Sequence, residues 1–350
     1  MEKFVKGNEA VVIGALHAGC DAFFGYPITP ANEICHAAAE WFPALDRVFL
    51  QAECETASIN MVYGAAAAGV LSMTASSGPG MSLMQEGLSY MAGAKLPGVI
   101  VDIMRAGPGL GNVYPEQADY NQAVKGGGHG NYSCIVLAPG NVQEMCDLTM
   151  RAFELSVKYR NPAIVLADAV LGQMMETLRL PEKELAPPDL SAWAAQGTRE
   201  TRGNLITSIF LDAQQQSDHN AALQKNYAEM QSAEAMSECY RVDDAEVVLV
   251  AYGVSSRVSR TAVDALRAQG VKAGMFRPVS LVPFPRAALC AACKGKRVVA
   301  VELSAGQFRN DVAFHLAEGL GSRVEVGLVN RMGGLLLKVD DVVNAVRQKA

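Results

Sequence analysis

Three segments carry residue types that could bind an anion or move a proton. The first reads Gly25-Tyr26-Pro27-Ile28-Thr29-Pro30; Thr29 could cap a helix there, with Pro30 in its first turn, near free backbone N–H groups that attract anions. The second places Glu53 and Glu55 at the head of a stretch of small and apolar residues. In the third, Arg105 follows an apolar run, and its guanidinium fork suits a carboxylate.

Each of these segments also has an ordinary structural explanation. The first could be a capped turn with no ligand, and Arg105 could form a structural ion pair. An acid at a helix start is either solvated and favoured by the helix dipole or buried for function. Glu53 fits the solvated case better and Glu55 the buried one, and the residues alone leave the two near even.

Two further segments are rich in glycine. Ser76-Ser77-Gly78-Pro79-Gly80 stands between an apolar run and a helical pattern, so its amides could face an anion or a cofactor ring. Lys125-Gly-Gly-Gly-His129 brings a lysine and a base close to exposed backbone, or forms a plain flexible loop.

The elements that must position these residues alternate along the chain. Helical patterns separate short apolar runs that read as buried parallel strands. The expected strands are 22–25, 71–74, 98–104, 134–137 and 163–166. The expected helices are 7–19, 30–41, 55–68, 82–94 and 142–159, the last with Asn141 as N-cap. This alternation predicts an open, mainly parallel α/β sheet.

Composition divides the chain into three parts. Residues 1–177 form the first α/β domain, and 178–242 are proline-rich at the start and then polar, as expected of a linker arm. The strand–helix alternation returns in 243–350, which predicts a second, smaller α/β domain with helices such as 255–269, closed by Gly270.

Bulk properties exclude several classes of protein. A net charge of −6 gives no basic footprint for nucleic acid. The longest uncharged apolar stretch, 62–73, is too short for a membrane span, and we expect a cytoplasmic protein with no signal peptide. The eight cysteines are scattered, with a lone Cys290-Ala-Ala-Cys293, so we expect no metal ligands. The chain contains neither GxxxxGK[ST] nor a helix-opening GxGxxG, which disfavours a nucleotide-binding protein or a nicotinamide dehydrogenase.

Taken in order, the motifs resemble one family. The segment 25–30, the Glu55 helix, Ser77-Gly-Pro-Gly-Met-Ser-Leu-Met-Gln-Glu-Gly87 and Arg105 with Gln117-Ala-Asp-Tyr120 are similar to the pyrimidine-domain subunit of 2-oxoacid:ferredoxin oxidoreductases. Phe276-Arg-Pro-Val-Ser-Leu-Val-Pro-Phe-Pro285 and Val301-Glu-Leu-Ser-Ala-Gly-Gln307 resemble that subunit's second domain. The resemblance implies a thiamine diphosphate pyrimidine-binding fold followed by a transketolase-C-terminal-like domain.

The resemblance also implies a chemistry that requires partner subunits. A thiamine-diphosphate-binding subunit would hold the diphosphate and Mg²⁺, while this chain would receive the pyrimidine. Glu55 would be the catalytic acid that hydrogen-bonds the ring nitrogen. Further partners would be a ferredoxin-like subunit with 4Fe-4S clusters, a gamma-type subunit, ferredoxin and the 2-oxoacid, with coenzyme A taking the acyl group.

The site residues carried over by the resemblance fall into two groups. The cofactor contacts would be Tyr26, Pro27, Ile28, Glu55, Ser77 and Gly78, and the substrate contacts would be Thr29, Arg105 and Leu110. Leu110 and the adjoining glycines are similar to the branched-chain (2-oxoisovalerate) subgroup, because an apolar side chain suits an apolar substrate tail. Ala106 departs from the family's usual glycine. The same chemistry on 2-oxoglutarate or pyruvate, and a non-catalytic scaffold subunit, remain alternatives.

Overall fold

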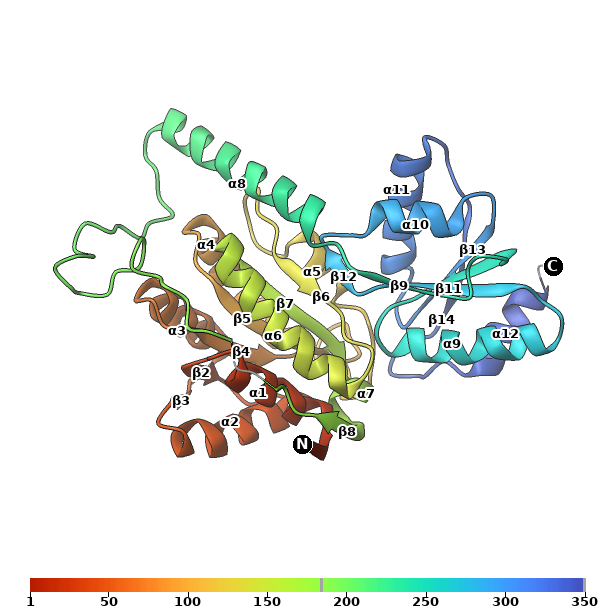
Figure 1. The fold of residues 1–350 in the computed structure, drawn as a ribbon, viewed down its shortest axis with the longest axis horizontal. Coiled ribbons are helices and arrows are strands. Elements are labelled where there is room, and N and C mark those ends of the chain that lie inside the picture. The colour runs from red at the N-terminus through yellow and green to blue at the C-terminus, as the bar shows by residue number, and fades with distance from the viewer. Residues whose placement is uncertain (183–184, 349–350) are drawn as a thin grey trace.

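The computed structural model describes residues 1–182 and 185–348. Its larger part is built on a seven-stranded sheet with strand order β12-β6-β7-β5-β4-β2-β3 (Figure 1). All neighbours in this sheet are parallel except β12, which is antiparallel to β6. The strands are β2 (Ala22–Gly25), β3 (Val48–Gln51), β4 (Ser72–Ser76), β5 (Gly98–Met104), β6 (Ile135–Leu137), β7 (Pro162–Asp168) and β12 (Ser280–Val282).

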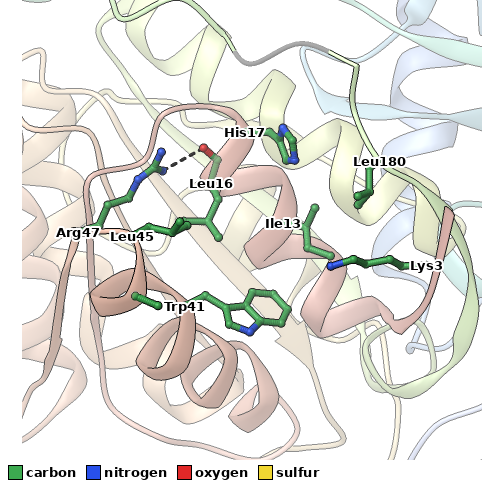
Figure 2. Close-up of a pocket in the computed structure, with 9 residues that line it drawn as sticks. Lys3, Ile13, Leu16, His17, Trp41, Leu45, Arg47 and Leu180 are labelled. Atoms are coloured by element: carbon green, nitrogen blue, oxygen red, sulfur yellow. Dashed lines mark hydrogen bonds between the residues drawn. The ribbon is translucent and has the colours of Figure 1, made fainter. Parts of the chain in front are cut away.

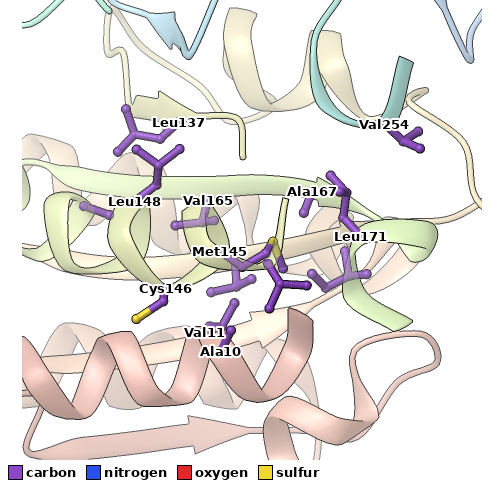
Figure 3. Close-up of a cluster of buried hydrophobic side chains, with 14 of the residues drawn as sticks. Ala10, Val11, Leu137, Met145, Cys146, Leu148, Val165, Ala167, Leu171 and Val254 are labelled. Carbon is purple, nitrogen blue, oxygen red and sulfur yellow. The ribbon is translucent and has the colours of Figure 1, made fainter. Parts of the chain in front are cut away.

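Helices pack on both faces of this sheet, because its strands are apolar on both sides. They are α1 (Gly7–His17), α2 (Asn32–Ala44), α3 (Glu55–Ala67), α4 (Gly78–Gly93), α5 (Tyr120–Lys125), α6 (Val142–Tyr159) and α7 (Ala169–Gln173). In β5, Val99, Val101 and Ile103 contribute to the core that holds α1 and α6, part of which is drawn in Figure 3. Alternation turns Ile100 and Met104 to the opposite face, into the core that holds α3 and α4.

A second sheet of five strands forms the smaller part, with order β14-β13-β10-β11-β9. Its strands are β9 (Ser237–Tyr240), β10 (Val247–Val250), β11 (Ala273–Pro278), β13 (Arg297–Glu302) and β14 (Val326–Asn330). Its helices are α9 (Gly253–Ala268), α10 (Arg286–Cys293), α11 (Gln307–Leu320) and α12 (Val339–Gln348). The two mainly parallel α/β sheets confirm the predicted fold class.

The segment between the two α/β parts begins as a strand. β8 (Met175–Arg179) pairs antiparallel with β1 (Glu2–Lys6), and the chain then runs through irregular structure to α8 (Ala213–Ala233). Figure 1 shows α8 leading toward the second sheet. The arm expected at 178–242 includes residues 183–184, and the domain expected at 243–350 includes 349–350; these four residues lie outside the described part of the chain.

The two α/β parts are joined by buried polar contacts. Arg277 of β11 is 4% exposed, and its guanidinium donates to the Glu144 carboxylate of α6, with one Nη1–Oε1 distance of 3.0 Å. Asn141 caps α6 as predicted, because its side chain accepts the Glu144 N–H at 2.8 Å. Within the described residues, no helix is long and apolar enough to cross a membrane.

Candidate functional site

The carboxyl ends of β2, β4 and β5 bring three of the segments noted in the sequence, 25–30, 76–80 and the one that begins at Arg105, to one edge of the sheet. These strands are neighbours and run parallel, so the segments at 26–30, 77–80 and 105–110 leave the sheet on the same side. Open α/β sheets bind their ligands at this kind of edge. Motifs that are far apart in the sequence therefore lie close together in the structure.

Glu55 is the first residue of α3 and is only 6% exposed, whereas Glu53 is exposed. An added Cβ at Gly80 would lie 2.4 Å from Glu55 Oε1 and 2.0 Å from Ser76 Oγ. The first turn of α4 thus approaches the carboxylate so closely that no side chain fits between them. Burial of Glu55 and exposure of Glu53 agree with the distinction made from the sequence.

Unpartnered hydroxyl groups lie in the same region. The Oγ atoms of Ser76 and Ser77 are buried, and neither has a hydrogen-bond partner in the described part of the chain. Buried hydroxyls are normally hydrogen-bonded, so these two oxygens can donate to or accept from a bound polar molecule. Gly78 takes a φ of +28° where the chain turns into α4.

Arg105 follows β5 and is oriented by backbone carbonyls. One Nη donates to Thr29 O at 2.9 Å and the other to Leu110 O at 3.2 Å, while Nε is buried without a partner. No carboxylate of residues 1–182 or 185–348 lies within ion-pair distance of its guanidinium. The structural ion pair considered from the sequence is therefore not found, and the guanidinium keeps donor capacity for an anion.

The expectation that Thr29 caps a helix is wrong. The N–H of Ala31 donates to Ile28 O at 2.8 Å, and this turn delays the helix, so that Ala31 is the N-cap and α2 begins at Asn32. Pro30 therefore precedes the helix as well. The Thr29 hydroxyl is exposed and accepts from Asn32 Nδ2 at 3.0 Å.

The remaining predicted contact residues are exposed or partly buried. Tyr26 is exposed, and Pro27 and Ile28 are partly buried. Leu110 lies in the loop after β5 with 83% of its surface exposed. The carbonyl of Leu110 accepts a hydrogen bond from Arg105, another predicted site residue, and the substrate contact of the Leu110 side chain stays a prediction.

Gln117, a residue whose role the sequence does not indicate, connects the loop after β5 to the second α/β part. Its side chain donates to Tyr252 O at 3.1 Å and accepts from Ser255 Oγ at 2.8 Å and from the Leu303 N–H at 2.9 Å. It is 1% exposed. The loop that carries Leu110 is thus attached to the second α/β part.

Lys125 and His129 lie outside this cluster. Lys125 forms an ion pair with Asp311 of α11, and the His129 ring packs edge-on against Tyr90 with centroids 5.7 Å apart. Their contacts tie the glycine-rich loop to α11 and α4, which supports a structural role for both side chains.

A separate hollow lies between α1, α2 and the β1–β8 pair (Figure 2). It is lined by apolar side chains such as Ile13 and Trp41. Arg47 already donates to Leu16 O at 3.0 Å and to Cys20 O at 2.8 Å. This hollow contains none of the predicted site residues.

Fold and site together define an α/β protein with two sheets. A buried acid and a guanidinium without an ion-pair partner in the described part of the chain lie at one edge of the larger sheet. Family models match nearly the whole chain. Residues 13–242 match the model described as pyruvate flavodoxin/ferredoxin oxidoreductase, thiamine diP-bdg, and residues 245–342 match pyruvate:ferredoxin oxidoreductase core domain II.

Individual relatives agree with the family models. The chain is 59% identical to the ketoisovalerate oxidoreductase subunit VorB of Methanothermobacter marburgensis, over 99% of this chain and 98% of the relative. It is 41% identical to the 2-oxoglutarate synthase subunit KorA of Archaeoglobus fulgidus, over 89% and 90% of the two chains.

A solved structure shows the same fold. The 2-oxoglutarate:ferredoxin oxidoreductase from Magnetococcus marinus superposes with a TM-score of 0.89 at 27% identity; the match covers 99% of this chain and 65% of that longer one. The chain belongs to the 2-oxoacid:ferredoxin oxidoreductase family, as the subunit with the thiamine-diphosphate-binding domain. Within it, the chain falls with the branched-chain type.

Proposed function

We propose that this chain forms the pyrimidine side of a thiamine diphosphate site shared with a partner subunit. The enzyme would convert 2-oxoisovalerate, coenzyme A and oxidised ferredoxin to acyl-CoA, CO₂ and reduced ferredoxin. The observation that carries this proposal is the placement of two groups at one edge of the sheet: buried Glu55, and Arg105 without a carboxylate partner among the described residues. An acid for the cofactor ring and a cation for the substrate carboxylate are the two groups that this chemistry requires from the chain.

The residues around Glu55 fit an aminopyrimidine ring. The Ser76 and Ser77 hydroxyls are buried without partners among the described residues, and Gly80 puts no side chain against the Glu55 carboxyl. Bound thiamine diphosphate supplies the carbon nucleophile for the 2-oxo carbon. Glu55 would hold a proton at a ring nitrogen, and the serine hydroxyls would fix the orientation of the ring.

Arg105 would bind the carboxylate of the 2-oxoacid. Its hydrogen bonds to Thr29 O and Leu110 O hold the guanidinium in place before substrate arrives, and such preorganisation lowers the entropy lost on binding. The Thr29 hydroxyl is exposed on the same turn and would be a second donor to that carboxylate.

The partners and remaining cofactors follow from the proposed division of the site. A thiamine-diphosphate-binding subunit would hold the diphosphate with Mg²⁺, and a ferredoxin-like subunit would carry 4Fe-4S clusters to ferredoxin. A gamma-type subunit would complete the complex. The Magnetococcus marinus relative has coenzyme A bound, which supports coenzyme A as the acyl acceptor.

The choice of 2-oxoisovalerate as substrate is supported by the sequence identity of the chain to relatives with different substrates. Identity is 59% to a ketoisovalerate oxidoreductase subunit and 41% to a 2-oxoglutarate synthase subunit. Leu110 would place an apolar side chain beside Arg105, suited to a branched alkyl tail and unsuited to a second carboxylate. Activity on 2-oxoglutarate or pyruvate is the alternative that a substrate panel would detect.

The decisive experiment compares Glu55→Gln with Glu53→Gln in the co-purified complex. Anaerobic viologen reduction with coenzyme A and a panel of 2-oxoacids measures activity, and size-exclusion chromatography checks assembly. We expect 2-oxoisovalerate to give the highest kcat/KM, Glu55→Gln to be inactive while assembled, and Glu53→Gln to match the wild type. Full activity of Glu55→Gln would refute the catalytic role and favour a scaffold subunit. Activity of the isolated chain would refute the shared site.

A further inference from the structure

A fully buried acid, Asp102, and a partly buried acid, Asp119, lie near the turn between β4 and α4. Asp102 of β5 is 0% exposed, and neither of its carboxyl oxygens has a hydrogen-bond partner within the described residues. Asp119, immediately before α5, has its Oδ2 buried and equally unpartnered. Unpartnered buried oxygens are costly, and neither acid has a place in the function proposed above.

The fold places both acids beside the turn that joins β4 to α4. Asp102 is the register partner of Ser76 in the parallel β4–β5 pair, so it faces α3 and α4 together with Ile100 and Met104. An added Cβ at Gly78 would lie 3.8 Å from Asp119 Oδ2 and 3.9 Å from Arg105 Cγ. Asp119 and Arg105 therefore both lie close to Gly78. The described residues show no ion pair between them, yet Arg105 is close enough to lower the pKa of Asp119.

The charged and titratable groups around the pair come from several elements. Asp119 is influenced by Arg105 after β5, by Glu116 of its own loop and by the Gly78 amide. Tyr252, in the second α/β part, lies near both acids. Asp168 and Glu302 also lie near Tyr252, and Glu55 of α3 and Ser76 both lie close to Gly80.

We infer that Asp102 and Asp119 hold one proton between them, and that the charge on Asp119 sets the affinity of Arg105 for the substrate carboxylate. The inference rests on the proposed function, because it takes Arg105 as the carboxylate-binding group. Asp119 is then a positioning residue that acts through Arg105, and Asp102 is the neutral neighbour that lets Asp119 ionise.

The surroundings of each acid support this division. Burial raises the pKa of Asp102 well above its usual range, and the neighbouring Asp119 raises it further. Burial also raises the pKa of Asp119, to about 6, against the lowering effects of the Gly78 amide and Arg105. Two neighbouring carboxyls, one fully and one partly buried, cannot both ionise easily, so near neutral pH Asp119 is charged and Asp102 keeps its proton.

The consequence is a pH-dependent Michaelis constant. Above pH 6 the charged Asp119 partly offsets the positive charge of Arg105, and below pH 6 Arg105 is uncompensated. A 2-oxoacid stays ionised throughout this range, so it should bind more tightly at pH 5 than at pH 7.5. We expect KM to be about three- to tenfold lower at pH 5.

The test measures KM and kcat for 2-oxoisovalerate from pH 5 to 8 in the assembled complex. The variants are Asp119→Asn and Asp102→Asn, with Asp147→Asn as matched control, because Asp147 on α6 also has its pKa raised by burial but lies outside the site. Wild type and Asp147→Asn should show KM rising through pH 6, and Asp119→Asn should keep a low, flat KM. Infrared difference spectra at pH 7 should lose a protonated-carboxyl band in Asp102→Asn and retain it in Asp119→Asn.

Two results would overturn the inference. One is a KM of Asp119→Asn that still rises through pH 6 as in the wild type. The other is a protonated-carboxyl band that Asp102→Asn leaves unchanged, a measurement that decides the question even if Asp119→Asn fails to assemble. The Arg105→Gln variant distinguishes failure of this inference from failure of the proposed function. If its KM equals that of the wild type, Arg105 does not bind the substrate carboxylate, and the proposed function fails at that point.

Discussion

Replacing Gly80 by alanine tests whether the close approach of α4 to Glu55 matters for activity. An added Cβ would lie 2.0 Å from Ser76 Oγ and 2.4 Å from Glu55 Oε1, well inside van der Waals contact. Both oxygens belong to side chains that can rotate, so the chain can fold by moving them. We therefore expect the substitution to displace the carboxyl while leaving the fold in place.

The magnitudes can be worked from the contacts. Overpacking a core costs about 1–3 kcal/mol, and exchanging glycine for alanine in a helix returns about 1 kcal/mol. The net change in the free energy of unfolding should thus be about 0–2 kcal/mol of destabilisation. Activity should suffer far more, because a displacement of about 1 Å in a catalytic group can lower the rate about 100-fold.

Gly64→Ala is the matched control for this experiment. Gly64 lies in the interior of α3 with nothing within 4 Å of an added Cβ, so it should gain about 1 kcal/mol of stability and keep full activity. Thermal unfolding followed by circular dichroism and anaerobic viologen reduction by the complex measure both properties. A Gly80→Ala complex with wild-type activity would show that the position of Glu55 tolerates the shift, and the argument from close approach would fail.

Three further substitutions test the fold. Arg277→Met should lower the free energy of unfolding by about 2–4 kcal/mol, because it leaves the Glu144 carboxylate without its buried partner; urea denaturation giving less than about 1 kcal/mol would contradict this. Asn141→Ala should cost about 1 kcal/mol through loss of the α6 cap, again measured in urea, and an unchanged midpoint would show that the cap contributes nothing. His315 packs against Phe284 with ring centroids 4.0 Å apart, and burial lowers its pKa to about 4. Since the unfolded chain binds the proton more tightly, the free energy of unfolding should fall as pH drops from about 6.5 toward 4. His315→Gln should remove the share of this fall that His315 causes, as measured by thermal unfolding between these pH values. Identical pH profiles of variant and wild type would refute the lowered pKa of His315.

Local sequence patterns were sufficient for the main elements of the fold. The strands at 22–25 and 98–104 and the helix at 142–159 have the predicted bounds, since an uninterrupted apolar run or a capped amphipathic segment carries its own signal. The sequence left burial and solvation of the two glutamates near even, and the structure buries Glu55 and exposes Glu53. Ordered motifs along the chain were enough to indicate the family.

Other elements depended on contacts that no local pattern records. β1 pairs with β8, which puts Glu2 beside Arg179 although the two residues are at opposite ends of the first α/β part in the sequence. β12 follows β11 of the second sheet in the chain but pairs with β6 of the first. The β3 strand is mostly exposed at the sheet edge. Such strands have short or mixed patterns, and their stability comes from partners that are distant in sequence.

The candidate site likewise depends partly on the sequence alone and partly on the tertiary structure. The sequence by itself determined which residue types were available at the strand ends, including Thr29, Glu55 and Arg105. Only the tertiary structure decided that Arg105 has no carboxylate partner among the described residues, that Thr29 precedes rather than caps α2, and that the buried Asp102 lies near the partly buried Asp119. The physical reason is that charge pairing and desolvation depend on which atoms surround a group in three dimensions, and those neighbours come from segments far apart in the chain.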